Sequence, residues 1–336
     1  MTVELKDIKP FPTYREIRSK DLDWINHRSD KYWDYRKKWV DYPKNLFLSD
    51  FPLHLDVETT NLCNLECPMC SRTVQIKEGT YVDIGTMGMD LYKKMIDEGA
   101  ENGLCSLKLN FLGEPLSDPH IVERVKYAKD KGILDVMFNT NAALLDEKMS
   151  YKILEAGIDD VFFSFDSIDP SKYNKIRVGT DFDTVVNNIK NFVRIIKDEG
   201  YNHVQTRSSM VVLPGTTKQE LEDYKNFWLP IVGIVGFDEW VDHSSQGENS
   251  EYSDYNPDFV CSQPYQRLFV MWDGVSIPCC LDVKRAYSLG NANDLTLKEI
   301  WHGEKLNKMR DIHLNGDYRE IDMCKTCYIP HATTGS

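Results

Sequence analysis

Apolar and polar positions alternate in a strand-like pattern six times along the middle of the chain, and helical patterns separate these runs. The strand-like runs cover residues 53–60, 105–112, 135–141, 160–166, 203–213 and 234–242. The clearest helical pattern occupies residues 185–196, with an apolar residue at every third or fourth position. Because each connection between runs is long enough for a helix, the strands should be parallel. Six units are too few for the usual eight-stranded closure. The pattern therefore predicts an α/β fold, an open, partial (β/α)6 TIM-like barrel.

The polar positions within these runs share one parity. In the first run, His54, Asp56 and Glu58 alternate with apolar residues. Helices cover the outer face of such a sheet, so the polar parity should face the lumen. The same reasoning gives further lumen candidates: Asn110, Asn139, Asn141, Ser164, Asp166, Arg207 and Asp242. A lumen that opens at the carboxyl ends of the strands is where barrels of this kind bind ligands. The alternative interpretation is that some of these residues are solvated strand ends.

The segments on either side of the barrel pattern differ from it. Residues 1–50 are polar and aromatic, and we expect a helical N-terminal extension packed on the barrel at residues 51–250. In residues 251–336 the pattern predicts a short β-hairpin at 267–278, which turns at Asp273-Gly274. A helix should follow from Thr296, which opens a capping box. We therefore expect a small C-terminal domain built from a hairpin and a helix.

Composition narrows the partners and the compartment. The formal charge of −13 argues against nucleic acid and against an anionic membrane surface. The first residues lack a secretory signal pattern, and the apolar runs are too short to span a bilayer. We therefore expect a cytoplasmic protein. Disulfides among its nine cysteines are then not expected, because that compartment is reducing, and the spacing of the cysteines points to metal.

Three of these cysteines lie together in the loop after the first strand. Cys63, Cys67 and Cys70 follow the spacing C-x3-C-x2-C. Thiolates are soft ligands that suit iron–sulfur clusters or zinc. Three cysteines on a four-iron cluster leave one iron open to a substrate or cofactor. Taken alone, the three residues also fit part of a zinc site.

This loop resembles the hallmark of the radical S-adenosylmethionine (radical SAM) superfamily. The resemblance implies a partial (β/α)6 barrel and a [4Fe–4S] cluster whose open iron binds S-adenosylmethionine (SAM). In that family the reduced cluster cleaves SAM to a 5′-deoxyadenosyl radical, which abstracts hydrogen from the substrate.

More of the family pattern follows at the ends of later strands. Gly113-Glu114-Pro115 resembles the GGE motif, which meets the SAM amino group, with Leu112 in place of the usual first glycine. The resemblance further implies a polar SAM contact at Asn141, ribose contacts at Ser164 and Asp166, and an adenine contact at Met69, where an aromatic residue is commoner.

A second set of cysteines lies near the C-terminus. Cys261, Cys279, Cys324 and Cys327 form a complete four-ligand set, which alone fits structural zinc as well as iron–sulfur. Downstream of such a barrel the set resembles the SPASM/twitch appendage, which implies an auxiliary [4Fe–4S] cluster. A full SPASM set has seven cysteines for two clusters, so we expect one cluster and a twitch-like form. Cys280 is open to three roles: a ligand in place of Cys279, a hydrogen-atom donor, or packing.

The resemblance also implies a reaction class. Enzymes of this short architecture dehydrogenate or epimerise sugars and aminocyclitols. We expect oxidation of an alcohol to a ketone on a carbohydrate-like small molecule, with the auxiliary cluster as electron acceptor and flavodoxin or ferredoxin as electron donor. The alternatives are a sugar epimerase, a peptide maturase, and a non-enzymatic electron carrier or zinc protein. Candidate substrate-binding or proton-accepting residues are Glu58, Arg72, Arg177, Asp242 and His243.

Overall fold

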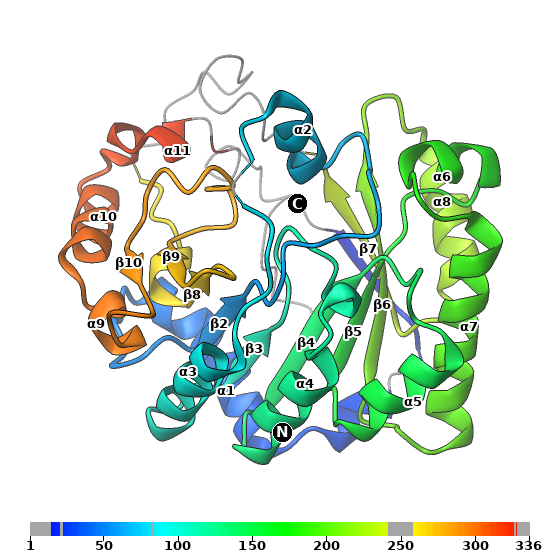
Figure 1. Cartoon of the computed structure of the whole chain (residues 1–336), viewed down its shortest axis with the longest axis horizontal. Coiled ribbons are helices and arrows are strands. Elements are labelled where there is room, and N and C mark those ends of the chain that lie inside the picture. The colour runs from blue at the N-terminus through cyan, green and yellow to red at the C-terminus, as the bar shows by residue number, and fades with distance from the viewer. Residues whose placement is uncertain (1–14, 21–22, 82, 241–257, 326, 328–336) are drawn as a thin grey trace.

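A ten-stranded sheet forms the centre of the computed structural model (Figure 1), which describes residues 15–20, 23–81, 83–240, 258–325 and 327. Six consecutive parallel strands within it form the partial barrel that the sequence predicts. They are β2 (His54–Val57), β3 (Ser106–Lys108), β4 (Asp135–Thr140), β5 (Asp160–Ser164), β6 (Gln205–Val212) and β7 (Ile234–Glu239). Each lies inside its predicted run, so the open α/β barrel is confirmed.

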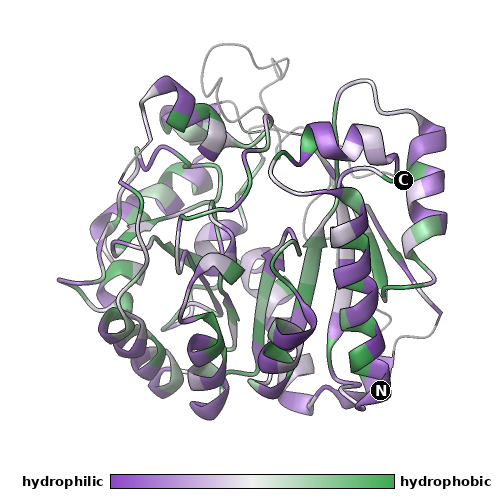
Figure 2. Ribbon diagram, turned by 45° about the vertical axis from the view of Figure 1, so that its right-hand side comes forward, coloured by the Kyte–Doolittle hydropathy of each residue, from purple (hydrophilic) through white to green (hydrophobic). Residues whose placement is uncertain are grey.

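Helices connect these strands, and all but the first of them lie along the outer face of the sheet (Figure 1). They are α2 (Ser71–Glu78), α3 (Met89–Glu101), α4 (Ile121–Asp130), α5 (Glu147–Glu155), α6 (Pro170–Ile176), α7 (Phe182–Asp198) and α8 (Lys218–Trp228). The predicted apolar stripe of α7, which includes Val185, Ile189 and Phe192, is fully buried. It joins Leu55 and Val57 of β2 in one hydrophobic cluster. Figure 2 shows the hydrophilic and hydrophobic residues that alternate along these helices. Burial of this outer apolar parity leaves the polar parity for the lumen.

The C-terminal hairpin extends the same sheet. Strand β8 (Arg267–Val270) pairs in parallel with β2, and β9 (Val275–Ile277) returns antiparallel beside it. Gly274 makes the predicted turn with a φ of +90°, a conformation that favours glycine. Strand β10 (Gly290–Asn291) pairs with β9. The helices α9 (Leu297–Trp301), α10 (Glu304–Leu314) and α11 (Asp322–Lys325) follow, and Thr296 forms the predicted capping box. The loop after β9 is thereby held beside the first strand of the barrel.

The N-terminal segment contains a strand that the sequence did not predict. Strand β1 (Arg15–Arg18) pairs antiparallel with β7 at the edge of the sheet. A 3-10 helix, η2 (Asp23–His27), and helix α1 (Asp30–Lys44) follow it. Aromatic residues of this segment form a cluster with Leu53 and Ile234 at the amino ends of β2 and β7. The segment therefore lies at the end of the barrel opposite the cysteine loop.

Three further 3-10 helices, η3 (Pro115–Ser117), η4 (Gln263–Tyr265) and η5 (Tyr318–Glu320), complete the described elements. No helix in the described ranges is both long enough and apolar enough to cross a bilayer. The expected boundary between barrel and C-terminal domain, at residue 250, lies outside the described residues.

Candidate active site

A cavity of about 460 Å³ lies at the carboxyl ends of the barrel strands. We call it the carboxyl-end cavity. Cys63, Cys67 and Cys70 all line it. It is also lined by most of the SAM contacts that the resemblance implies: Met69, Gly113, Glu114, Asn141 and Ser164. Loops that are far apart in sequence therefore meet at one opening.

The cysteine loop is short and held by backbone contacts. The Cys70 amide donates to the Cys67 carbonyl at 3.0 Å, and Cys70 precedes the first residue of α2. The Leu65 amide donates to the Cys63 sulfur at 3.4 Å. Burial raises the pKa of Cys63 to about 11, so its thiol needs a nearby positive charge to become a thiolate. Within the described ranges, no three His, Cys, Asp or Glu side chains are arranged to hold a single metal ion. Three soft donors around one cavity fit a multi-iron cluster with one open iron.

Gly113 allows the loop after β3 to touch the cysteine loop. A Cβ on this residue would lie 2.1 Å from the Thr60 carbonyl oxygen and 2.7 Å from that of Leu62. The Glu114 amide donates to the same Leu62 oxygen at 2.7 Å. The neighbouring Pro115 is buried at the start of η3 and does not line the cavity. Glycine is thus required here by a close approach of two backbones.

The Glu114 carboxylate is engaged within the protein. It accepts hydrogen bonds from the Thr140 hydroxyl at 2.6 Å and from the Asn141 amide at 2.8 Å. It is buried, and burial raises its pKa. The Asn141 side chain donates to the Asn64 side chain at 2.9 Å, inside the cysteine loop. Glu114 therefore fixes the end of β4, and Asn141 connects that end to the cluster loop.

Asp166 lies beneath the cavity rather than in its wall. Its carboxylate forms an ion pair with Arg177 at 2.5 Å and accepts from the Val211 amide at 2.9 Å. Arg177 lines the cavity, with its guanidinium 3.9 Å from the Cys67 sulfur. The ribose contact expected at Asp166 stays a prediction; in this geometry the carboxylate is paired with Arg177. Ser164, two residues earlier, does line the cavity.

The predicted catalytic residues occupy different environments. Glu58 is fully buried outside the cavity wall, where it pairs with Arg285 at 3.2 Å. Its burial raises its pKa. Arg72 lines the cavity, but its Nε donates to the Asn61 carbonyl at 2.7 Å and so supports the cysteine loop. Asp242 and His243 lie outside the described residues.

The C-terminal cysteines gather around a separate, small apolar cavity of about 20 Å³. Its lining includes Cys261, Cys279, Cys324 and Cys327. His313 also lines it, with its Nε2 3.7 Å from the Cys324 sulfur. Four thiols around one enclosed space fit a fully ligated iron–sulfur cluster, with no coordination position left for a substrate.

Cys280 borders a different cavity from Cys279, although the two thiols are hydrogen-bonded to each other. It lines the carboxyl-end cavity and is absent from the lining of the small cavity that holds Cys279. A single peptide unit thus separates Cys279, in the C-terminal cysteine group, from Cys280, at the barrel lumen. This geometry places Cys279 with the other C-terminal cysteines and leaves Cys280 exposed to a molecule in the lumen.

A second cavity of about 410 Å³ lies at the amino ends of the strands, and we call it the amino-end cavity. It shares Asn110, Phe111, Asn139, Asp238 and Cys280 with the carboxyl-end cavity. The predicted lumen residues His54, Asp56 and Arg207 line it. The lumen is therefore polar along its length, as the strand parity predicts.

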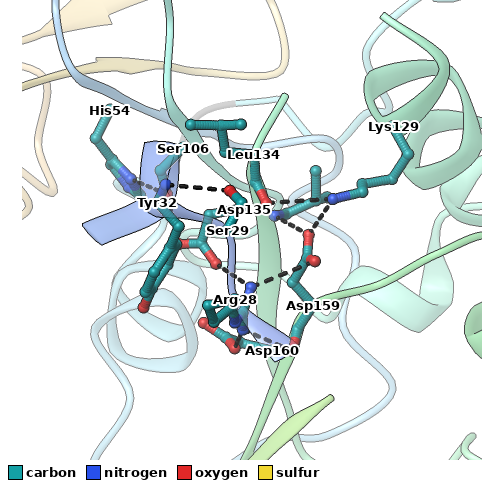
Figure 3. Close-up of polar contacts among 11 residues, drawn as sticks. Arg28, Ser29, Tyr32, His54, Ser106, Lys129, Leu134, Asp135, Asp159 and Asp160 are labelled. Carbon is teal, nitrogen blue, oxygen red and sulfur yellow. Dashed lines mark hydrogen bonds and ion pairs between the residues drawn. The ribbon is translucent and has the colours of Figure 1, made fainter. Parts of the chain in front are cut away.

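The N-terminal segment closes this end through a buried ionic network (Figure 3). Arg28, directly after η2, lies 3.2 Å from Asp135 and 3.3 Å from Asp159, and it also contacts Asp160. Ser106 donates to Asp135 at 3.0 Å and is hydrogen-bonded to His54 at 2.9 Å. Removal of one partner from such a network leaves buried charges without compensation. Arg28 thus fastens the N-terminal segment to the starts of β4 and β5.

Two lumen residues were missed by the sequence analysis. Lys108, at the end of β3, has the same strand parity as Ser106 and as Asn110, which follows the strand; Asp238 is near the end of β7. Burial raises the pKa of Asp238, although Arg207 and Lys108 act to lower it. The signal that could have found both was strand parity, because each has the polar parity of its run.

Comparison with protein-family models identifies both parts of the chain. Residues 57–227 match the radical SAM superfamily, and residues 261–328 match an iron–sulfur cluster-binding domain, SPASM. These domains imply SAM with a [4Fe–4S] cluster, and auxiliary iron–sulfur at the C-terminal cysteines.

Individual relatives agree with this assignment. The chain is 28% identical over 174 residues to a GTP 3′,8-cyclase of Alkaliphilus metalliredigens, covering 52% of this chain and 51% of that protein. It thus spans about half the length of that relative. It is 26% identical to the tungsten-containing aldehyde ferredoxin oxidoreductase cofactor-modifying protein of Pyrococcus furiosus, covering 81% of this chain and 86% of that one.

The fold agrees with a solved structure, BtrN in complex with AdoMet and 2-DOIA. The TM-score is 0.55 at 18% identity, with 83% of this chain and 94% of BtrN covered. The matched families consist of enzymes, which sets aside a simple electron carrier or zinc protein. The chain therefore belongs to the radical SAM superfamily and carries a C-terminal SPASM iron–sulfur cluster-binding domain.

Proposed function

We propose that this enzyme oxidises an alcohol group of a small, carbohydrate-like molecule to a ketone. The observation that carries the proposal is the position of Cys279 and Cys280 on either side of one peptide unit. It puts a complete four-cysteine group, suited to electron transfer, directly beside the lumen. The lumen itself is lined by amide and charged side chains that can hydrogen-bond a polyol.

When bound, SAM and the iron–sulfur clusters would supply hydrogen-atom abstraction and a one-electron acceptor. Oxidation of an alcohol removes a hydrogen atom from carbon, a proton from the hydroxyl and one further electron. The hydrogen atom would be recovered in 5′-deoxyadenosine, a base of the chain would take the proton, and the electron would leave towards the C-terminal cysteine group. The chain must therefore supply a proton acceptor that both cavities can reach.

Asp238 meets this requirement best. It lines both cavities at the carboxyl end of β7. Its carboxylate is close enough to Arg207 and Lys108 for their charges to favour its ionised form, while burial raises its pKa overall. A base with a raised pKa accepts a proton more readily than an ordinary aspartate. Glu58, in contrast, is engaged by Arg285 outside the cavity wall.

The test is an anaerobic assay of the reconstituted enzyme, with a reductant such as flavodoxin or dithionite, against a panel of sugars, cyclitols and peptides. Oxidation predicts a product two mass units lighter and one 5′-deoxyadenosine per product. Asp238→Asn should reduce product formation by about 100-fold, the lower end of general-base effects. An Asp238→Asn variant that retained full turnover would remove Asp238 from the proposal.

Epimerisation is the second candidate, and the exposure of Cys280 to the lumen favours it. Hydrogen donation by this thiol would give, in H2O, a product with the same mass as the substrate. In D2O the product would carry one deuterium on carbon. Cys280→Ala would then abolish epimer formation. For an oxidase the same variant should still form ketone, so this comparison separates the two reactions.

A further inference from the structure

The amino-end cavity contains a cation that has no carboxylate within ion-pair distance in the described part of the chain. Lys108 projects from β3 into this cavity. Across the described residues, its ammonium group makes neither an ion pair nor a hydrogen bond within the protein. Burial lowers its pKa, and the charges of Arg267 and Arg207 lower it further against the opposing effect of Asp56. An ammonium group held in this way gains stability from any anion that enters the cavity.

The carboxylates around Lys108 are already engaged. Asp56 lies 3.3 Å from His54 and 3.4 Å from Arg267. At the rim, Glu16 pairs with Arg18 at 2.6 Å. Each of these acids thus has a closer cation, and Asp56 acts on Lys108 only from beyond ion-pair distance.

The floor of the cavity has its own cation as well. Asp135 and Asp160 contact Arg28, which is not part of the cavity wall. Burial raises the pKa of Asp160 well above its usual range, which reduces the negative charge of this network. The remaining acid in the wall, Asp238, faces both Lys108 and Arg207. Lys108 and Arg207 therefore both act on the Asp238 carboxylate.

Lys108 and Arg207 lie in the same cavity, and Lys108 is close in sequence to the junction of the two cavities. Lys108 is two residues from Asn110, which the two cavities share together with Asp238 and Cys280. Arg207 lies on the Phe162 ring, 3.8 Å from its centroid, and this contact orients the guanidinium in the cavity. A group bound at Lys108 would thus leave the rest of a small molecule beside Asp238 and Cys280.

We propose that Lys108, supported by Arg207, binds an anionic group of the substrate, a carboxylate or a phosphate. This inference rests on the proposed function, because it makes the substrate an anionic carbohydrate whose alcohol lies at the junction of the cavities. The anion anchors the molecule at the amino end, and the hydroxyl is presented to Asp238. A neutral sugar lacks this anchor.

Equilibrium binding to the reconstituted holoenzyme tests the inference without any turnover. The probes are glucose, glucuronate and glucose 6-phosphate, and calorimetry measures the binding of each. The last two probes distinguish a carboxylate from a phosphate. At least one anionic sugar should bind about tenfold or more tightly than glucose, as expected for one charge-assisted contact. Equal binding of all three probes would overturn the inference.

Three variants assign the effect to Lys108. Lys108→Met should remove the preference, lowering affinity for the anionic probe about tenfold. Lys108→Arg keeps the charge and should retain the preference. Lys126→Met is the matched control, because Lys126 is exposed on α4 and pairs with Asp130. Unchanged anion binding in Lys108→Met, with a melting temperature equal to that of Lys108→Arg, would refute the role of this residue.

The inference and the proposed function fail in different ways. Anion-selective binding that needs Lys108, without any ketone product, would support the inference and count against oxidation. Oxidation of neutral polyols at rates unaffected by Lys108→Met would support oxidation and overturn the anion site.

Discussion

Gly113→Ala tests the contact between the loop after β3 and the cysteine loop. The added Cβ would lie 2.1 Å from the Thr60 carbonyl oxygen, 2.7 Å from that of Leu62 and 2.8 Å from the Asn61 Cα. All three neighbours are backbone atoms, so no side-chain rotation can relieve the overlap. One of the two loops must move by about 1 Å, and overpacking of this kind costs about 1–3 kcal/mol.

The movement would separate the cluster-binding loop from the residues expected to contact SAM. If the whole cost falls on the binding-competent arrangement, the dissociation constant of SAM rises about 5- to 150-fold. Misplacement by about 1 Å can also reduce turnover about 100-fold. We therefore expect Gly113→Ala to lower both SAM affinity and the rate of 5′-deoxyadenosine formation, with iron content close to that of the wild type.

The assay is equilibrium binding of SAM to the reconstituted enzyme, with 5′-deoxyadenosine formation measured in parallel. Gly88→Ala is the matched control, because Gly88 has a φ of −61° and a Cβ there would meet no atom within 4 Å. A Gly113→Ala variant that bound SAM within a factor of about two of the wild type and of Gly88→Ala would refute the reasoning, because that factor is below 1 kcal/mol.

Three other experiments test separate parts of the account. Cys279→Ala should lose about four irons per chain while Cys280→Ala keeps them, since a four-iron cluster needs its ligands; equal losses on iron analysis would contradict the placement of the two residues. Arg28→Met should lower the free energy of unfolding by about 3–5 kcal/mol in chemical denaturation, because it leaves buried carboxylates unpaired; a loss below about 1 kcal/mol would contradict the network. Activity should fall at acid pH as Asp238 gains a proton, at a higher pH than for an ordinary aspartate because its pKa is raised. A pH profile of ketone formation with the same acid limb in Asp238→Asn would assign that limb to another group.

Strand parity allowed much of the lumen to be predicted. Runs of alternating apolar and polar residues are local features, and helices must cover the apolar side. The positions of Asn110, Asn139 and Ser164 follow from that single constraint. The same logic missed Lys108, because a lysine in a strand is more often exposed than directed into a lumen.

Ion pairs between distant segments could not be predicted from the sequence. Asp166 has the lumen parity, yet Arg177 holds it beneath the cavity. Glu58 likewise pairs with Arg285, which lies more than two hundred residues later in the chain. The pairing of β1 with β7 depends on backbone hydrogen bonds at a sheet edge, and the four residues of β1 show no apolar alternation. In each case the partner is fixed by tertiary structure.

The central claim is that Cys63, Cys67 and Cys70 hold the cluster at which SAM is cleaved. The most direct measurement is 5′-deoxyadenosine formation by the anaerobically reconstituted enzyme with dithionite and SAM, together with iron analysis, for the wild type and for Cys67→Ala. We predict 5′-deoxyadenosine and about eight irons for the wild type, and no 5′-deoxyadenosine with about four irons retained for the variant. Formation of 5′-deoxyadenosine by Cys67→Ala, or none by the wild type at any iron loading, would contradict the account.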